Sequence, residues 1–101
     1  MANLTKDEAK RILSNTAPDK AFWVNNGPVI KNIMELATAA SNMTTAQFVH
    51  HVNSAKNDFT KWVSDVIRDT ELAQQLKQVK TKKDLNSTVT NRLKQLKAML
   101  K

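Results

Sequence analysis

Helix start signals recur along this chain, and they constrain its fold more than any other feature. At a helix N-terminus a Ser, Thr, Asp or Asn side chain accepts a backbone N–H, and an acid or amide three residues later can complete a capping box. Four such pairs are present: Thr5 with Glu8, Asn32 with Glu35, Thr44 with Gln47, and Thr81 with Asp84. Asp69, before the segment TELAQQL, is a fifth candidate cap. The regular recurrence of these N-cap signals predicts a series of short helices.

Apolar residues after these signals follow the three- and four-residue spacing of helices. The clearest run contains Phe59, Trp62, Val63, Val66 and Ile67. We therefore expect an all-α fold, a compact bundle of about six short helices, and a chain of 101 residues has room for one domain with one core. The expected core consists of Ile12, Leu36, Phe48, Val52, Phe59, Trp62, Val66, Leu76, Leu93 and Leu96.

One segment between the first two helices, KAFWVNNGPVIKN, has no helical periodicity. It holds the only glycine of the chain and one of its two prolines. Gly27 tolerates a left-handed conformation and Pro28 fixes its own φ, so a tight turn is expected there. The aromatic flanks fit either a two-stranded ribbon or an extended lid over the core. We favour the lid, because an isolated two-stranded ribbon is only marginally stable.

The positive charge of the chain is concentrated at one end. The net charge is +7, yet the residues before Lys77 include eight basic and eight acidic side chains. From Lys77 onward there are eight basic residues and one acid, Asp84. Positive charge concentrated at one end of a chain favours attraction to polyanions. The basic residues of this region are Lys77, Lys80, Lys82, Lys83, Arg92, Lys94, Lys97 and Lys101.

The last predicted helix, at about residues 82–100, separates apolar and basic residues around its axis. With Leu85 at 0° and about 100° per residue, the apolar stripe covers about 0° to 80°. On the same scale, Lys83, Lys94, Lys97 and Lys101 fall between about 120° and 180°, and Arg92 falls near 340°. Four lysines therefore line one edge of the helix, and Arg92 lies on the opposite shoulder.

These features predict a non-catalytic nucleic-acid-binding protein, with DNA favoured, that is associated with chromatin or a nucleoid. Its eight basic residues would contact phosphates with little sequence preference. A membrane surface is disfavoured as a partner, because the apolar stripe is narrow and lacks interfacial Trp or Phe. Two alternatives stay open. The lysines can simply keep the helix soluble, or the chain is a protein-interaction module, self-association included, in which Phe22, Trp23 or the last helix docks a partner.

The stretch HHVNSAKNDFTKWV draws attention as a metal or catalytic site. Neighbouring residues on a helix point about 100° apart, so His50 and His51 cannot both face one ion. We expect no metal and no cofactor there, and expect one histidine to tie a corner between two helices. The polar residues of that corner, Asn53 and Asn57 or Asp58, would satisfy its backbone, with Asp58 as the expected N-cap.

Catalysis and DNA reading by a helix-turn-helix are also disfavoured. Asp58, Asp65 and Asp69 fall near one edge of the fourth helix, but the chain has no Gly-rich phosphate loop and no nucleophile motif. We expect no enzyme activity. The same carboxylates would oppose a polyanion if this helix entered the major groove.

No cysteine is present, and no apolar run approaches the roughly 20 residues of a membrane span. The start of the chain, MANLTKDEAKR, has no apolar signal segment. We therefore expect a cytoplasmic protein, associated with the nucleoid if it binds DNA.

The stretch FVHHVNSAKNDFTKWVSDVIRDTELAQQL resembles a small uncharacterised domain family of archaeal and bacterial proteins. The family pattern is His-Val-Asn, then Asn-Asp-Phe, a Trp three residues on, an Asp, and an Asp before Glu-Leu-Ala. The matching positions here are His51, Val52, Asn53, Asn57, Asp58, Phe59, Trp62, Asp65, Asp69, Glu71, Leu72 and Ala73. The likeness extends from Phe22 to about Leu96. It implies a helical fold and leaves the activity open, since the family has no known function.

Overall fold

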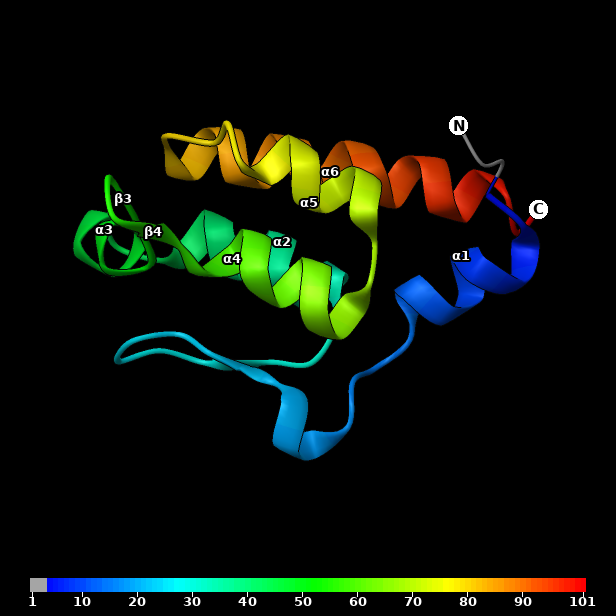
Figure 1. Cartoon of the computed structure of the whole chain (residues 1–101), viewed down its shortest axis with the longest axis horizontal. Coiled ribbons are helices and arrows are strands. Elements are labelled where there is room, and N and C mark those ends of the chain that lie inside the picture. The colour runs from blue at the N-terminus through cyan, green and yellow to red at the C-terminus, as the bar shows by residue number, and fades with distance from the viewer. Residues whose placement is uncertain (1–3) are drawn as a thin grey trace.

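Helices make up most of the structure, which is a computed structural model that describes residues 4–101 (Figure 1). The α-helices are α1 (Lys6–Leu13), α2 (Ile33–Asn42), α3 (Thr45–His51), α4 (Asp58–Trp62), α5 (Thr70–Leu76) and α6 (Lys82–Ala98). A short 3-10 turn, η1 (Pro18–Lys20), and a π-helical turn, η2 (Val63–Ile67), complete the helical part. Two antiparallel ribbons pair β1 (Phe22–Trp23) with β2 (Val29–Ile30), and β3 (Val52–Asn53) with β4 (Lys56–Asn57). The expected helical fold is confirmed, and the ribbons are an addition to it.

Five of the six predicted N-caps form, and the sixth, Asp58, does not cap a helix. The side chains of Thr5, Asn32, Thr44, Asp69 and Thr81 accept the backbone N–H three residues ahead, at 2.8–3.2 Å. At Thr44 the box is reciprocal, because the Gln47 side chain accepts the Thr44 N–H at 2.8 Å. These bonds satisfy backbone donors that a helix leaves free at its start. The helix starts are therefore encoded locally.

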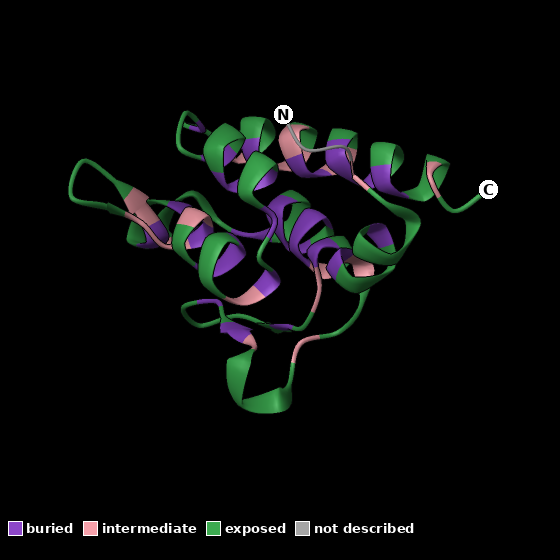
Figure 2. Cartoon of the chain, turned by 45° about the vertical axis from the view of Figure 1, so that its right-hand side comes forward, coloured by how far each residue is buried: buried purple, intermediate pink, exposed green. Residues whose placement is uncertain are grey.

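The core is centred on α2 and α6, which pack against each other more extensively than any other pair of elements. Figure 2 shows α6 with its buried side turned toward the other helices and its exposed side outward. Eight of the ten predicted core residues are buried: Ile12, Leu36, Phe48, Phe59, Trp62, Leu76, Leu93 and Leu96. Val52 and Val66 are half-buried against this core. Within residues 4–101, none of the helices combines the length and the apolar character needed to cross a membrane.

The aromatic segment before α2 forms a ribbon, so the favoured lid is wrong. Phe22 pairs with Ile30 and Trp23 pairs with Val29. Phe22 and Ile30 are buried, and the Phe22 ring stacks on Phe59 at a centroid distance of 4.8 Å. This buried inner face stabilises a ribbon that would be marginal in isolation.

The turn of this ribbon uses its glycine differently from the prediction. Asn26, with φ 55°, takes the left-handed conformation expected of Gly27. Gly27 is required instead by close packing, because a Cβ there would lie 2.9 Å from Cγ1 of Val24 and 3.0 Å from Nε2 of Gln47. Asn is one of the few residues that tolerate a left-handed conformation, so the turn forms without a glycine at that position.

The second ribbon separates α3 from α4, and Asn57 rather than Asp58 is the N-cap of α4. The Asn57 Oδ1 accepts the Thr60 N–H at 3.0 Å, and its Nδ2 donates to the Leu76 carbonyl at 2.8 Å. One side chain therefore starts α4 and holds the end of α5 against it.

The junction between α4 and α5 has an irregular backbone. The π-helical turn η2 ends at Ile67, and its C-cap, Arg68, is a non-glycine residue in the left-handed region with φ 64° and ψ 42°. The Arg11 guanidinium of α1 donates to the carbonyls of Ile67 at 2.8 Å and of Arg68 at 3.2 Å. The next residue, Asp69, caps α5. Contacts from α1 thus hold the strained residue between two helices.

We expect Asn57→Ala to lower the free energy of unfolding by about 1–2 kcal/mol, because both the cap of α4 and the tie to Leu76 are lost. Urea denaturation would measure this change. Asn91→Ala is the matched control, since Asn91 is exposed on α6 and its loss should change stability by less than about 0.5 kcal/mol. Equal effects of the two substitutions would contradict this role of Asn57.

Candidate functional site

Seven lysines from Lys77 onward carry the positive charge of the C-terminal region. Six are exposed: Lys77, Lys80, Lys83, Lys94, Lys97 and Lys101. Lys82 is half-buried and its Nζ donates to the Met43 carbonyl, at the end of α2, at 3.1 Å. Among residues 4–101, none of the seven has a carboxylate within ion-pair distance. Their charge is therefore not compensated locally.

Four of these lysines, Lys83, Lys94, Lys97 and Lys101, form the stripe that we call the basic edge. Lys83, Lys94 and Lys97 lie on the exposed side of α6, and Lys101 follows the end of this helix. The basic edge borders the contact with α2, because Asn86 of α6 donates its Nδ2 to the Ala37 carbonyl at 2.8 Å and to the Ser41 Oγ at 2.9 Å. The one acid of α2, Glu35, accepts the backbone N–H of Lys31 at 2.7 Å. An uncharged helix face thus borders the basic edge, and it does not screen the lysines.

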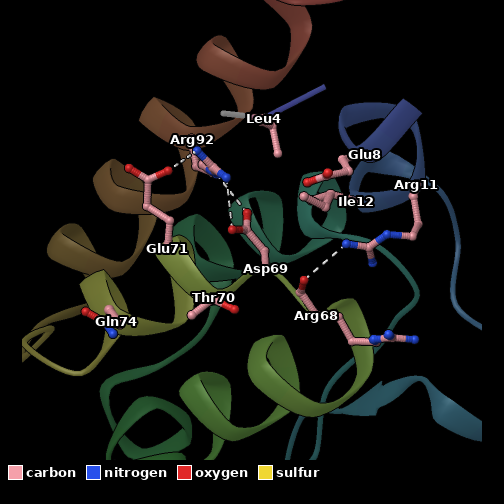
Figure 3. Close-up of a pocket in the computed structure, with 10 residues that line it drawn as sticks. All are labelled: Leu4, Glu8, Arg11, Ile12, Arg68, Asp69, Thr70, Glu71, Gln74 and Arg92. Atoms are coloured by element: carbon pink, nitrogen blue, oxygen red, sulfur yellow. Dashed lines mark hydrogen bonds and ion pairs between the residues drawn. The ribbon is translucent and has the colours of Figure 1, made fainter. Parts of the chain in front are cut away.

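Arg92 does not belong to the exposed basic surface, contrary to the sequence prediction. Its side chain is buried, and it pairs with the Asp69 carboxylate through Nε at 2.7 Å and Nη2 at 2.9 Å (Figure 3). Its Nη1 donates to Glu71 Oε2 at 2.7 Å. Burial alone would lower the pKa of Arg92, but the two carboxylates outweigh it and raise the pKa above its ordinary value. The Arg92 guanidinium is therefore buried in ion pairs and is not available to bind a phosphate.

The helical periodicity already contained a signal for the burial of Arg92. Its position near 340° is only about 20° from Leu85, at the margin of the apolar stripe. A charged residue so close to a buried stripe needs a buried partner. That partner is Asp69, which lies 23 residues earlier in the chain and could not be identified from helical spacing.

A cavity of about 440 Å³ lies beside this ion pair, between α1, the α4–α5 junction and α6 (Figure 3). Its charged lining is balanced, with three arginines, Arg11, Arg68 and Arg92, and three acids, Glu8, Asp69 and Glu71. Arg11 is bound to the carbonyls of Ile67 and Arg68, and Arg92 to two of the acids. These contacts join α1 and α6 to the irregular backbone of the junction, which is a structural role.

His51 ties the corner between α3 and α4, as expected of one of the two histidines. It is buried, its Nδ1 lies 2.9 Å from Asp58 Oδ2, and its Nε2 accepts the Asn25 N–H at 3.0 Å. A backbone N–H can only donate, so Nε2 is unprotonated and Nδ1 carries the proton toward Asp58. His51 thereby joins the first ribbon to the start of α4.

His50 is exposed and lies outside this hydrogen-bond network. Its ring meets the His51 ring edge-on at a centroid distance of 4.8 Å. In the described part of the chain, no group of three or more His, Cys, Asp or Glu residues is placed to hold a metal ion. Asp65 is exposed on η2, and Asp69 is committed to Arg92. The three acids that fell on one edge in the sequence therefore face three different environments.

Asp58 forms an ion pair with Lys56 and does not cap α4. Besides His51, it accepts a hydrogen bond from Lys56 Nζ at 3.0 Å. Burial would raise the pKa of Asp58, but the hydrogen bonds from His51 and Lys56 outweigh it and lower the pKa below its ordinary value. The ionised carboxylate is therefore the form that stabilises this corner.

Lys77 and Lys80 lie before α6 and gather with Lys56, a residue that the sequence did not single out. The three lysines line a hollow of about 520 Å³ between the β3–β4 turn and the connection from α5 to α6. Lys56 is 21 residues from Lys77 in the chain, so charge counting along the sequence could not group them.

The aromatic residues considered for docking a partner separate into two environments. Phe22 is buried and forms part of the core. Trp23 is 73% exposed on the outer face of the first ribbon, beside Val29. Figures 1 and 2 both show this ribbon on the opposite side of the helices from α6. Trp23 and the basic edge are therefore separate surfaces.

We expect Arg92→Met to lower the free energy of unfolding by about 3 kcal/mol or more, because it leaves the buried Asp69 carboxylate unpaired. Lys94→Met is the matched control on the exposed side of α6 and should change stability by less than about 0.5 kcal/mol. Urea denaturation measures both. The double substitution Arg92→Met with Asp69→Asn should recover part of the loss, and comparable effects of the two single substitutions would contradict the assignment.

We expect Asp58→Asn to be less stable than the natural sequence at neutral pH. The folded carboxylate has a pKa below the 3.8 of an unperturbed Asp, so its ionisation stabilises the folded state at pH values above about 4. As the pH falls through the folded pKa, both states bind the proton and the difference between the two proteins should shrink. Urea denaturation between about pH 7 and pH 3 tests this. A difference that widens toward low pH would contradict it.

Comparisons of the chain with protein-family models, with curated proteins and with solved structures find no match. The resemblance to an uncharacterised domain family therefore stays a prediction from the residues between His51 and Ala73.

Proposed function

We propose that this protein binds nucleic acid without catalysis, through phosphate contacts made by the basic edge. The observation that carries the proposal is the absence, among residues 4–101, of any carboxylate paired with a lysine from Lys77 onward. Asp69 and Glu71 bind Arg92 instead, and Asp84 is the one acid of α6. A row of uncompensated ammonium groups attracts a polyanion by electrostatic steering and counterion release.

The length of the basic edge suits an extended polyanion. Lys83 and Lys97 are 14 residues apart on α6, which corresponds to about 21 Å at about 1.5 Å per residue. Duplex DNA carries one phosphate charge per roughly 1.7 Å of its axis, so the edge spans several phosphates. DNA is our favoured polyanion, and association with chromatin or a nucleoid would follow from binding of this kind.

Little sequence preference is expected from these contacts. A lysine ammonium neutralises a phosphate as a point charge, and phosphate contacts position a protein without reading the bases. Arg92, the one arginine from Lys77 onward and the residue type that most often reads guanine, is buried in its ion pair. We therefore expect the protein to bind the charged backbone of a nucleic acid with little dependence on its base sequence.

Exposed Trp23 supports a second candidate, a protein-interaction module. Tryptophan is enriched where proteins bind each other, and the 73% exposure of this side chain leaves most of its apolar surface in water. Self-association through this ribbon would raise the mass in sedimentation as the concentration increases. Because the ribbon and the basic edge are on opposite sides, Trp23→Ser should abolish such association and leave DNA affinity unchanged.

Titration against duplex DNA at several salt concentrations tests the first candidate. The logarithm of the binding constant should fall by about 0.9 per unit of log salt for each phosphate contacted. Replacement of Lys83, Lys94 and Lys97 by Glu should abolish measurable binding, because three attractive contacts become repulsive.

A charge-matched control is available in the exposed lysines Lys6, Lys10 and Lys61. Their replacement by Glu lowers the net charge by the same amount and should leave most of the binding and its salt dependence in place. No binding at low salt, or equal losses in the two triple variants, would refute a role for the basic edge.

A further inference from the structure

The hollow beside the second ribbon is a distinct basic site. One wall is the β3–β4 ribbon with its turn at Ser54 and Ala55, and the other is the connection that carries Lys77, Val79 and Lys80. No acid lines it. Two segments distant in the chain thus place three lysines, Lys56, Lys77 and Lys80, around one concave surface of about 520 Å³.

The polar groups of the hollow are not equally available. The Asn53 side chain is bound to the Val49 carbonyl and the Ala55 N–H, and the Asn57 side chain to Leu76 and Thr60. Lys56 binds Asp58, and this pair is electrically neutral because His51, the other partner of Asp58, is uncharged in its observed hydrogen bonding. The charge that remains for a ligand is that of Lys77 and Lys80.

We propose that this hollow binds a terminal phosphate group. Two uncompensated lysines match a phosphomonoester, which carries about −1.5 to −2 charges near pH 7, better than an internal phosphodiester with one charge. The ammonium of Lys56 has two further N–H donors beside the one given to Asp58, so it adds hydrogen bonds to the phosphate oxygens.

Two sources can supply such a group: the end of a nucleic-acid strand, or a free phosphate compound. The first source rests on the proposed function. Figure 1 shows the β3–β4 ribbon beside the end of α6 at which Lys83 lies. A strand that follows the basic edge toward the start of α6 would therefore place its end near the hollow.

The test compares duplexes that differ only in a 5′-phosphate or 5′-hydroxyl, by fluorescence anisotropy at fixed low salt. The natural sequence should bind the phosphorylated duplex about fivefold more tightly, the gain expected of two or three exposed charge contacts. Lys77→Gln with Lys80→Gln should abolish this preference. Lys94→Gln with Lys97→Gln removes the same charge from the basic edge; it should weaken binding of both duplexes and keep the preference.

Titration with inorganic pyrophosphate, followed by amide NMR, separates the two sources and does not depend on DNA binding. Shifts confined to residues 53–57 and 77–80, and lost in the Lys77/Lys80 variant, would establish the site even if no duplex bound. Pyrophosphate binding without a preference for phosphorylated ends would assign the hollow to free phosphate compounds. The proposal would be overturned if the protein bound no pyrophosphate and bound both duplexes with equal affinity. It would also be overturned if the Lys77 and Lys80 substitutions left the NMR shifts and the duplex preference unchanged.

Discussion

The buried ion pair between Arg92 and Asp69 is the constraint on which the arrangement of the last two helices depends. Asp69 accepts two hydrogen bonds from the guanidinium and also caps α5, so one carboxylate sets both the start of α5 and the rotation of α6. An apolar pair could fill the same space without this directionality, whereas one partner alone would be a buried, uncompensated charge. With Arg92 turned inward, the opposite side of α6 must face solvent, and that side carries the basic edge.

Ion pairs of the acidic residues also shape the electrostatics of the surface. Arg92 pairs with Asp69 and Glu71, and Lys56 pairs with Asp58, which also contacts His51. Acids thus neutralise basic groups near the α4–α5 junction and the α3–α4 corner, while the lysines of α6 have no such partners in residues 4–101. In residues 4–101, the excess positive charge is therefore concentrated on the lysines from Lys77 onward.

Local features were predictable from the sequence, and features that depend on distant partners were not. The N-caps of Thr5, Asn32 and Thr44 follow from side chains within one turn, so their positions were found. The first ribbon was considered but ranked below a lid, because its stability comes from Phe22 packing on Phe59, 37 residues away. The basic edge was visible as a helical stripe, but the burial of Arg92 and the grouping of Lys56 with Lys77 needed the tertiary fold. Asn57 was weighed beside Asp58 as a polar residue of the corner, and only the backbone geometry shows which of them starts α4.

The packing of α2 against α6 has a consequence for how the chain acquires its structure during synthesis. Leu36, Ala37 and Ala40 of α2 leave the ribosome about 50 residues before the apolar face of α6 that covers them. Throughout that interval the central apolar surface has no permanent cover, and the local caps can order helices but cannot bury it. Completion of the core therefore waits for the segment that carries the basic edge, and a nascent chain stalled before it would be exposed to chaperones and to aggregation.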